Sequence, residues 1–361
     1  MPRLKKKGAE SVSAGSASEK KEKVKTPSGL DIAKKAIQKK YGNVISYLGD
    51  HEDMTIPTVS TGSLGLDIAL GRGGMARGRI YEIYGNPSGG KTTLALSVLI
   101  QAQKKGLNTA IVDAEHAMDP TLVKTMGADI SKILIVQGYC GEENLDGAEM
   151  LLKNAAVDLL IIDSVSALIP KSETLAEIGD DFIALLARLM SKALRRLVPL
   201  ANETNTLVIF INQIRHKVGA YGNPEAPTGG EALPFYATGR ISVKGAEYKS
   251  NRIVDSVSGE PIGHHAKLEV VKNKLAPPFR TATIPLIYGK GFDVHWEALT
   301  LATSLGIVDK NGAWYNYGDV KLGQGEFNVV NALREDADLY EDIRGQIISM
   351  TGLKELYECN K

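Results

Sequence analysis

The sequence of 361 residues is poor in cysteine, in tryptophan and in long apolar runs. Its two cysteines, Cys140 and Cys359, cannot build a disulfide framework, which excludes the disulfide-rich secreted class and suits a reducing compartment. No apolar stretch is long enough to span a membrane, because Asp163 and Asn212 interrupt the two longest candidates. No apolar segment of the secretory type follows the charged first residues, so we expect a cytoplasmic protein without a membrane partner.

The charges balance overall but are unevenly placed. The formal net charge is +1, yet the first 28 residues carry eight Lys and Arg against three Glu. They offer little that a core could bury, so we expect residues 1–28 to form a disordered basic tail. A solvated tail is the simpler interpretation, and an auxiliary nucleic-acid contact is the alternative. A helix is expected at residues 30–42, ending at Gly42.

Strands and helices alternate through the middle of the chain. The expected strands are 79–85, 108–116, 157–165 and 206–213, and the expected helices are 91–106, 143–156 and 181–198. Strands that are apolar on both faces and alternate with helices are typical of an α/β fold, with a mostly parallel central sheet flanked by helices. Residues 239–248 and 265–273 are expected to be half-exposed strands of an antiparallel extension. From about residue 294 the pattern of short helices and turns predicts a small α+β domain.

The stretch GNPSGGKT has the spacing G-x-x-x-x-G-K-[ST] of a phosphate-binding loop. Glycine allows the tight turn that points backbone N–H groups at phosphate oxygens, lysine adds a positive charge, and the threonine hydroxyl can bind Mg²⁺. An expected strand precedes the loop and an expected helix follows, so the positive N-terminus of that helix faces the same anion. The expected nucleotide-binding residues here are Gly85, Asn86, Pro87, Ser88, Gly89, Gly90, Lys91, Thr92 and Thr93.

Two acidic residues follow neighbouring apolar runs. Asp163 ends LLIID, where a carboxylate can hold Mg²⁺ through its water shell, although such an acid is often only a helix cap or a turn former. Glu115 follows AIVDA, and the C-terminal ends of parallel strands line one crevice. It can therefore lie near the terminal phosphate and deprotonate the attacking water. From spacing alone, a surface acid beside Asp113 is an equally good interpretation of Glu115.

Distinctive stretches occur in order from about residue 30 to the end of the chain. They are STGSLGLDIALGRGG (60–74), GNPSGGKTTL (85–94), VDAEHAMDP (112–120), IIDSVSALIPKSE (161–173), INQIR (211–215), NPEAPTGG (223–230), VVKNKLAPPF (270–279) and GAWYNYGD (312–319). Together they resemble the bacterial-type RecA recombinases. The resemblance implies a DNA-dependent ATPase that uses ATP and Mg²⁺. Such a protein forms a helical filament on single-stranded DNA and pairs it with homologous double-stranded DNA in recombination and repair.

The resemblance also implies roles at the nucleotide. Lys91 and Thr92 bind phosphate and Mg²⁺, Asp163 is the acid at the metal, and Glu115 is the catalytic base. Gln213, at the end of a buried strand, reports the γ-phosphate to the DNA site. The remaining implied nucleotide contacts are Asp119 and Tyr288 around the adenine, and Lys272 and Lys274, which reach ATP bound by a neighbouring subunit.

Two loops, residues 171–183 and 214–230, are implied to face the DNA. The implied DNA-binding residues are Ile183, Arg188, Ser191, Arg195, Arg215, Gly229, Gly230 and Lys267. Ile183 would sit between bases, the two helix arginines and the serine would contact phosphates, and the glycines would offer backbone N–H groups. For Arg195 a solvated helix face is the alternative. The second loop has no period of its own, so we expect it to fold only with DNA and ATP.

A few positions depart from the family pattern. Leu122 stands where an aromatic residue usually stacks on the adenine, which predicts weaker base contacts. Glu269 falls where a basic residue is typical, which puts the duplex-binding site in question. The long loop is one residue shorter than usual and has Tyr221 and Pro234 at unusual places. The chain ends at LKELYECNK without the family's acidic tail, so we expect altered regulation.

The expected domains are the tail 1–28, an N-terminal polymerisation module 29–53, an ATPase and DNA-binding core 54–293 and a small C-terminal domain 294–361. Two other functions compete with recombination: a ring helicase with a related core, and a non-catalytic DNA-coating protein. The motifs LGRGG and VVKNK favour a recombinase over a helicase. An intact set of hydrolytic residues argues against a coat, which needs no catalytic base.

Overall fold

The computed structural model describes residues 28–42, 44–51, 56–175, 184–216, 225–245, 248–255 and 258–358. The basic tail up to residue 27 and Ile183 lie outside the described residues, and of Arg215 only the backbone is described. The chain divides into two compact units, Met1–Met54 and Thr55–Lys361. The second unit contains every motif named above.

The first unit contains α1 (Gly29–Tyr41) and the short 3₁₀ helix η1 (Leu48–His51). The Ser28 hydroxyl accepts from the backbone N–H of Asp31, and the Asp31 carboxylate accepts from the backbone N–H of Ser28, which is a capping box. Gly42, at φ 76, ends α1 as predicted. Within the described residues α1 fully buries no side chain, and Leu30, Ile32 and Tyr41 are exposed.

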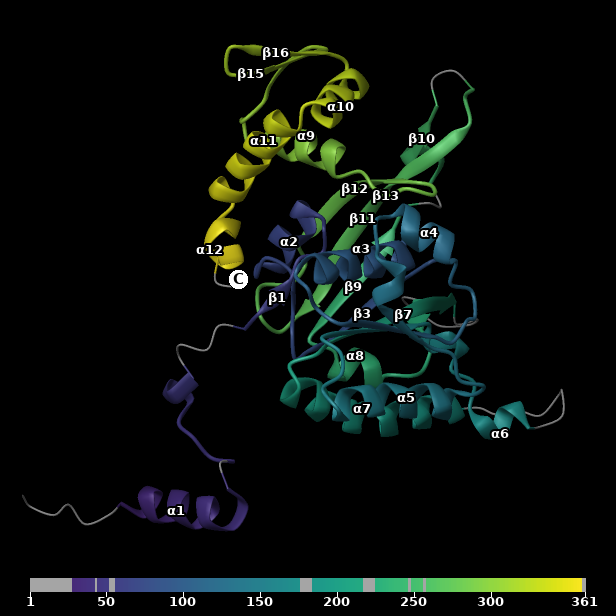
Figure 1. The fold of residues 1–361 in the computed structure, drawn as a ribbon, viewed down its shortest axis with the longest axis vertical. Helices are drawn as coiled ribbons and strands as arrows, with labels where there is room; N and C mark the ends of the chain where they lie inside the picture. The colour runs from purple at the N-terminus through teal and green to yellow at the C-terminus, as the bar shows by residue number, and fades with distance from the viewer. Residues whose placement is uncertain are drawn as a thin grey trace, which may run out of the picture. The chain divides into compact units, whose positions relative to one another are not determined.

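Within the described residues of the second unit, the largest sheet has eleven strands (Figure 1). Its main path runs β13-β12-β11-β9-β3-β7-β6-β4-β5, while β8 pairs with β7 and β10 pairs with β11. The bounds are β3 Ile80–Gly85, β4 Thr109–Asp113, β5 Ile133–Val136, β6 Leu159–Asp163, β7 Leu207–His216, β8 Glu225–Pro227, β9 Gly239–Lys244, β10 Arg252–Val254, β11 Pro261–Asn273, β12 Thr281–Ile287 and β13 Gly291–Phe292. The strands from β9 to β5 are parallel, which confirms the mostly parallel central sheet.

The prediction for residues 239–248 was right only in part. β9 pairs antiparallel with β11, as expected, but its other neighbour is β3, to which it is parallel. β9 is also mostly buried, because its side chains Ile241 and Val243 enter a hydrophobic core. The edge strand β5 was not predicted; Leu134 and Ile135 in it are exposed.

Helices cover both faces of this sheet (Figure 1). The helix bounds are α2 Leu64–Leu70, α3 Lys91–Lys104, α4 Pro120–Thr125, α5 Gly141–Lys153, α6 Lys171–Thr174, α7 Leu185–Glu203 and α8 Ala232–Tyr236. Two hydrophobic cores result: one contains residues of α2 and α3, and the other contains residues of α5, α7 and α8. Neighbouring strand residues enter opposite cores, as Ile209 and Phe210 of β7 do, which accounts for strands that are apolar at every position.

A third hydrophobic core holds together the C-terminal elements. Their bounds are α9 Val294–Ser304, β14 Asp309–Asn311, β15 Trp314–Tyr317, β16 Val320–Gln324, α10 Glu326–Glu335, α11 Ala337–Met350 and α12 Leu353–Glu358. Glu297 of α9 is fully buried at the N-terminus of α2, where it accepts from the Ser63 hydroxyl at 2.5 Å and from the N–H groups of Leu64 and Gly65. Burial raises the pKa of Glu297 to about 7.

A two-stranded sheet, β1 (Thr58–Val59) with β2 (Met75–Ala76), lies at the start of the second unit. Across the part of the chain that the structure describes, no helix has both the length and the apolar composition that a membrane span requires.

Candidate functional site

The phosphate loop joins β3 to α3, as the motif predicts. Gly90 adopts φ 99, in the left-handed region, and a Cβ there would lie 2.4 Å from Leu286 Cδ1. Gly90 also stands at the N-cap position of α3, so no side chain caps the first N–H groups of that helix. Uncapped N–H groups at a helix start are suited to bind an anion. The loop therefore fits a phosphate.

Lys91 lies within the concavity of this loop. Its ammonium group donates to the carbonyl oxygen of Asn86 at 2.8 Å. Burial lowers the pKa of Lys91, while the negative charges of Asp163 and Glu115 favour its protonated form. A positive charge held against a loop carbonyl in this way is placed to meet phosphate oxygens.

Thr92 and Asp163 meet at the ends of α3 and β6. The Thr92 hydroxyl donates to Asp163 Oδ2 at 2.9 Å. Burial raises the pKa of Asp163 to about 6, against the opposing effect of this hydrogen bond. A buried carboxylate that is disfavoured as an anion is stabilised by a cation beside it, so the pair fits Mg²⁺.

Glu115 lies just beyond the ends of β4 and β6, beside Gln213 of β7. Its Oε1 accepts from the Ser164 hydroxyl at 2.5 Å and from Gln213 Nε2 at 3.1 Å. The side chain is otherwise open to solvent, so it can meet a water molecule. The structure thus brings Glu115 and Gln213 into contact. Ser164 was missed from sequence, although it directly follows Asp163.

A pocket of about 510 Å³ opens beside the phosphate loop. It is lined by Ser88, Gly90, Lys91, Thr92, Thr93, Leu122, Met126, Leu286, Ile287, Tyr288, Gly289 and Gly291. Its volume and mixed lining are typical of a small-molecule site. Leu122, Met126 and Tyr288 supply an apolar wall that suits a base. Asp119 does not line the pocket; it caps α4 by accepting from the N–H of Thr121 at 2.8 Å.

Lys272 and Lys274 lie far from this pocket along the sheet. Lys272 of β11 is paired with Arg240 of β9, and Arg240 is paired with Glu82 near the start of β3, whereas the phosphate loop follows the end of β3. The Lys272 ammonium donates to the carbonyl oxygens of Pro234 and Phe235. These lysines therefore lie at the opposite end of the parallel strands from the phosphate loop of their own chain.

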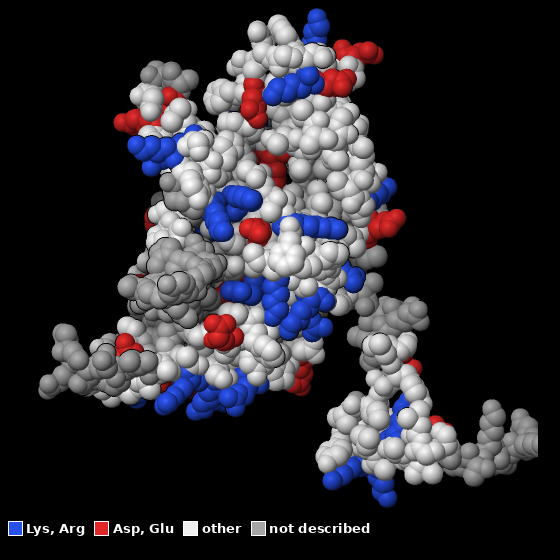
Figure 2. All heavy atoms as spheres, turned by 180° about the vertical axis from the view of Figure 1, so that it is seen from behind, with Lys and Arg blue, Asp and Glu red and all other residues white. Residues whose placement is uncertain are grey.

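The implied phosphate-contacting residues share one side of α7. Arg188 and Arg195 are exposed, and Arg195 Nη2 donates to the Ser191 hydroxyl at 3.2 Å. Figure 2 shows Lys and Arg side chains along the lower edge of the core, the edge at which Figure 1 places α5 and α7. This surface can attract a polyanion.

The long loop after β7 contains more structure than its sequence predicted. Residues 214–216 pair with residues 225–227 in an antiparallel ribbon, which we call the β7–β8 ribbon. The expectation of a loop without secondary structure was therefore wrong at both arms, since register between distant segments leaves no local signal. Residues 217–224, with Tyr221, lie outside the described residues.

Gly229 and Gly230 follow the ribbon and pack on α7. Both have φ near 80°, and a Cβ on Gly230 would lie 2.9 Å from Ala187 Cβ. A Cβ on Gly229 would lie 2.8 Å from Val165 Cγ1. Close packing therefore requires these glycines independently of any DNA contact. Lys267 lies exposed on β11, with Glu269 two residues further on the same face.

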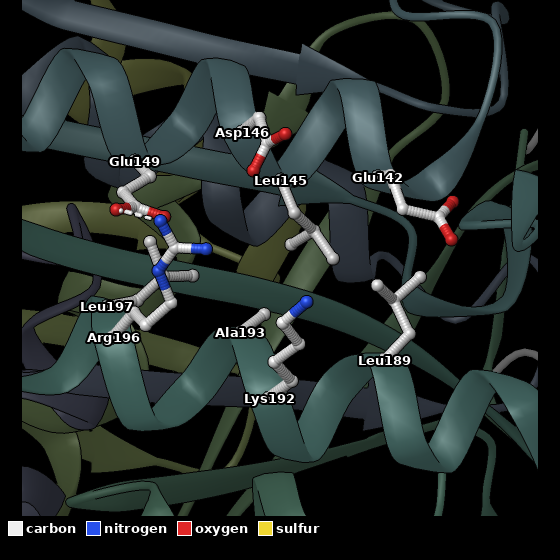
Figure 3. Close-up of a pocket in the computed structure, with 9 residues that line it drawn as sticks. All are labelled: Glu142, Leu145, Asp146, Glu149, Leu189, Lys192, Ala193, Arg196 and Leu197. Carbon is white, nitrogen blue, oxygen red and sulfur yellow. Dashed lines mark hydrogen bonds and ion pairs between the residues drawn. The ribbon is translucent and has the colours of Figure 1, made fainter.

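Another pocket, of about 140 Å³, lies between α5 and α7 (Figure 3). The Arg196–Glu149 ion pair, at 2.7 Å, stands at one end, and the Lys192 side chain extends between the two helices. This pocket shares no lining residue with the pocket at the phosphate loop. It is not part of the nucleotide site.

A parallel sheet with a strand–phosphate-loop–helix unit, and with carboxylates at adjacent strand ends, defines a P-loop nucleoside triphosphatase. Comparison with known families is more specific. Residues 28–293 match the family model described as RecA N-terminal domain, and residues 297–352 match RecA C-terminal domain. The chain belongs to the RecA family.

The curated relatives agree with this assignment. The chain is 46% identical to protein RecA of Thermus aquaticus over 321 residues, which cover 88% of this chain and 93% of that protein. It is also 46% identical to protein RecA of Bacillus thuringiensis (strain Al Hakam) over 328 residues, which cover 90% and 94%. RecA proteins are recombinases with DNA-dependent ATPase activity, and this chain is an ATP-hydrolysing member of that family.

Proposed function

We propose that the chain assembles with ATP into a helical filament on single-stranded DNA, and that it catalyses homologous pairing and strand exchange with double-stranded DNA in repair. The contact that carries this proposal is the hydrogen bond from Gln213 Nε2 to Glu115 Oε1 at 3.1 Å. It links the carboxylate suited to activate water with the strand from which the β7–β8 ribbon leaves the sheet. A ribbon that meets DNA can in this way change hydrolysis.

The residues at the phosphate loop have separate tasks in hydrolysis. ATP supplies the bond that is cleaved, and Mg²⁺ neutralises charge on its phosphates. Residues 85–93 hold the phosphates, with Lys91 as the positive charge, and Thr92 with Asp163 holds the metal. Glu115 takes the proton of the attacking water. The hydrogen bonds that Ser164 and Gln213 donate to Glu115 orient its carboxylate. Leu122 and Tyr288 flank the base, and Asp119, which caps α4 outside the pocket lining, is proposed to contact it from beyond them.

The DNA-binding surface combines α7 with the ribbon and its neighbouring loop. Its proposed contacts to single-stranded DNA are Ile183, Arg188, Ser191, Arg195, Arg215, Gly229 and Gly230. Exposed arginines on one side of a helix neutralise phosphates without reading sequence. Lys267 is proposed to contact the duplex, and Glu269 on the same face weakens that site.

Self-association is proposed from residues that lie away from the nucleotide site of their own copy. Lys272 and Lys274 lie at the opposite end of the sheet from their own phosphate loop, where they can meet ATP of a neighbouring copy. The exposed apolar side chains of α1 can pack on another copy in the same head-to-tail assembly. A heterologous contact of this kind generates an open filament when its rotation does not close into a ring. Residues 29–53 then serve polymerisation, residues 54–293 hydrolysis and DNA binding, and residues 294–361 form the C-terminal domain, all in the cytoplasm.

A strand-exchange assay tests the proposal. The full chain is incubated with ATP, Mg²⁺, circular single-stranded DNA and a linear duplex that is homologous or heterologous to it. We expect joint molecules with the homologous duplex alone, and none with Lys91→Ala, which lacks the phosphate-binding charge. Strand separation regardless of homology indicates a helicase, and DNA binding without any hydrolysis indicates a coat. Either result overturns strand exchange as the function.

A further inference from the structure

A buried polar network lies at the base of the β7–β8 ribbon. We call it the root network and define it as Glu82 of β3, Asn212 of β7, Arg240 of β9, and Thr228, which follows β8. Glu82 is fully buried, three residues before the phosphate loop begins, and Asn212 is fully buried as well. Burying a polar group lowers the stability of the fold unless the group is hydrogen-bonded. The hydrogen bonds of Glu82 and Asn212 therefore show which segments these two residues position.

Glu82 is the centre of the network. Its Oε2 accepts from Arg240 Nε at 2.5 Å, and its Oε1 accepts from Asn212 Nδ2 at 2.9 Å. The Arg240 guanidinium also lies over the ring of Tyr84, 4.6 Å from its centroid. The buried carboxylate is thus neutralised on one side and left to orient an amide on the other.

Asn212 ties the two arms of the ribbon together. Besides its bond to Glu82, its Nδ2 donates to the carbonyl oxygen of Thr228 at 2.9 Å. Its Oδ1 accepts from the N–H of Gln213 at 2.9 Å. Two acceptors face the NH₂ group and one donor faces the oxygen, so only this orientation of the amide satisfies every partner.

Thr228, on the returning arm of the ribbon, is hydrogen-bonded to Gln213 on the outgoing arm. Its N–H donates to the carbonyl oxygen of Gln213 at 3.2 Å. The next residues, Gly229 and Gly230, pack against α7, which carries the proposed DNA-contacting arginines. On the other side, the Gln213 side chain reaches Glu115. A continuous chain of contacts therefore runs from the proposed catalytic base through the root network to the DNA-facing glycines.

We propose that Glu82 is a positioning residue for DNA-dependent hydrolysis: through Asn212 it fixes both arms of the ribbon, so that DNA contact at Gly229–Gly230 alters how Gln213 meets Glu115. The inference rests on the proposed function. Glu82 touches neither nucleotide nor DNA in this scheme. It acts by holding an amide whose second hydrogen bond joins the outgoing arm to the returning arm.

Glu82→Gln tests the role of the carboxylate. An amide at position 82 can accept from only one of its two donors and presents its own NH₂ group to the other. ATP turnover is measured with and without saturating oligo-dT. We expect DNA-stimulated turnover to fall about tenfold or more, within the usual range of coupling between sites, while DNA-free turnover stays within about threefold.

Glu149→Gln is the matched control. Glu149 is also a buried carboxylate, ion-paired with Lys153 and Arg196, but it lies on α5. Its substitution should cost stability without changing the ratio of DNA-stimulated to DNA-free turnover. Equal loss of the DNA response in both variants would show that Glu82 is an ordinary buried ion pair, and this would overturn the proposal.

A double substitution separates stability from coupling. In Glu82→Gln with Asn212→Asp, the amide at 82 donates to the carboxylate at 212 and still accepts from Arg240, so the bond between the two positions returns with its direction reversed. The carboxylate at 212 cannot donate to the Thr228 carbonyl oxygen. We expect the melting temperature to recover toward that of the unmodified chain while the DNA response stays low. Recovery of both overturns the role of the Thr228 contact.

The outcomes distinguish this inference from the function on which it rests. If oligo-dT does not stimulate the unmodified chain, the proposed function fails first. If the unmodified chain is stimulated and Glu82→Gln is stimulated equally, only the positioning role fails. If Glu82→Gln melts below the assay temperature, the DNA response of the double substitution tests the proposal instead. In that variant every hydrogen bond of the root network is restored except the one to Thr228.

Discussion

At the scale of single residues, Glu115 and Asp163 differ in burial and in hydrogen-bond partners. Asp163 is buried and bonded to Thr92, whereas Glu115 is open to solvent and held by Ser164 and Gln213. The first environment suits a metal and the second suits a water molecule. The two carboxylates can therefore hold different roles at adjacent strand ends.

The change Glu115→Gln removes the proposed proton acceptor and keeps the size of the side chain and one oxygen that can accept hydrogen bonds. We expect ATP turnover to fall about 10²- to 10⁴-fold, with nucleotide and DNA binding retained, since only proton transfer at the water is lost. Turnover and the anisotropy of a labelled oligonucleotide measure the two effects. Glu203→Gln, on the exposed last turn of α7, is the control, and normal turnover in Glu115→Gln would remove Glu115 from its role.

At the scale of elements, α9 is joined to α2 by a buried carboxylate whose protonation matters for stability. Burial raises the pKa of Glu297 from its ordinary 4.5 to about 7, against the hydrogen bonds from Ser63, Leu64 and Gly65. Because the folded pKa lies above the unfolded one, the neutral form of Glu297 favours the folded state. Its contribution to the free energy of unfolding is complete below about pH 4.5 and is lost as the pH rises through 7.

Glu297→Gln makes this side chain permanently neutral. We expect the stability of the variant relative to the unmodified chain to rise between pH 5 and pH 8, by on the order of 3 kcal/mol at most, from the size of the pKa shift. The NH₂ group of the new side chain faces an N–H donor at the start of α2, which lowers the stability equally at every pH. Thermal melting across this pH range measures the difference, with the exposed Glu335→Gln as control. A variant that is equally destabilised at every pH would show instead that the charged carboxylate stabilises the N-terminus of α2.

The elements that sequence predicted are those with a local signal. The phosphate loop, the helix end at Gly42 and the apolar strands all follow from neighbouring residues. The parallel pairing of β9 with β3 and the ribbon arms at 214–216 and 225–227 depend on register between distant segments, which composition does not encode. Glu82 gave no signal either, because its partner Arg240 lies 158 residues away.

At the scale of the whole molecule, the sheet separates two halves of one proposed active site. The phosphate loop and Glu115 lie at the C-terminal end of the parallel strands, and Lys274 lies exposed at the opposite end. A lysine at that end can serve hydrolysis only for a neighbouring copy in a head-to-tail assembly. Lys274 is the better probe of this arrangement, because the Lys272 ammonium already binds carbonyl oxygens of α8.

Mixing two inactive variants tests the shared site. Lys274→Ala and Glu115→Gln should each lose DNA-stimulated ATP turnover alone. In an equimolar mixture, an interface is intact where Glu115 comes from the first variant and Lys274 from the second, so about a quarter of the interfaces should regain activity in random assembly. A mixture of Lys91→Ala with Glu115→Gln must stay inactive, because both defects fall in the same half of the site. Absence of recovery in the first mixture, with both variants still binding DNA, would place Lys274 outside the active site.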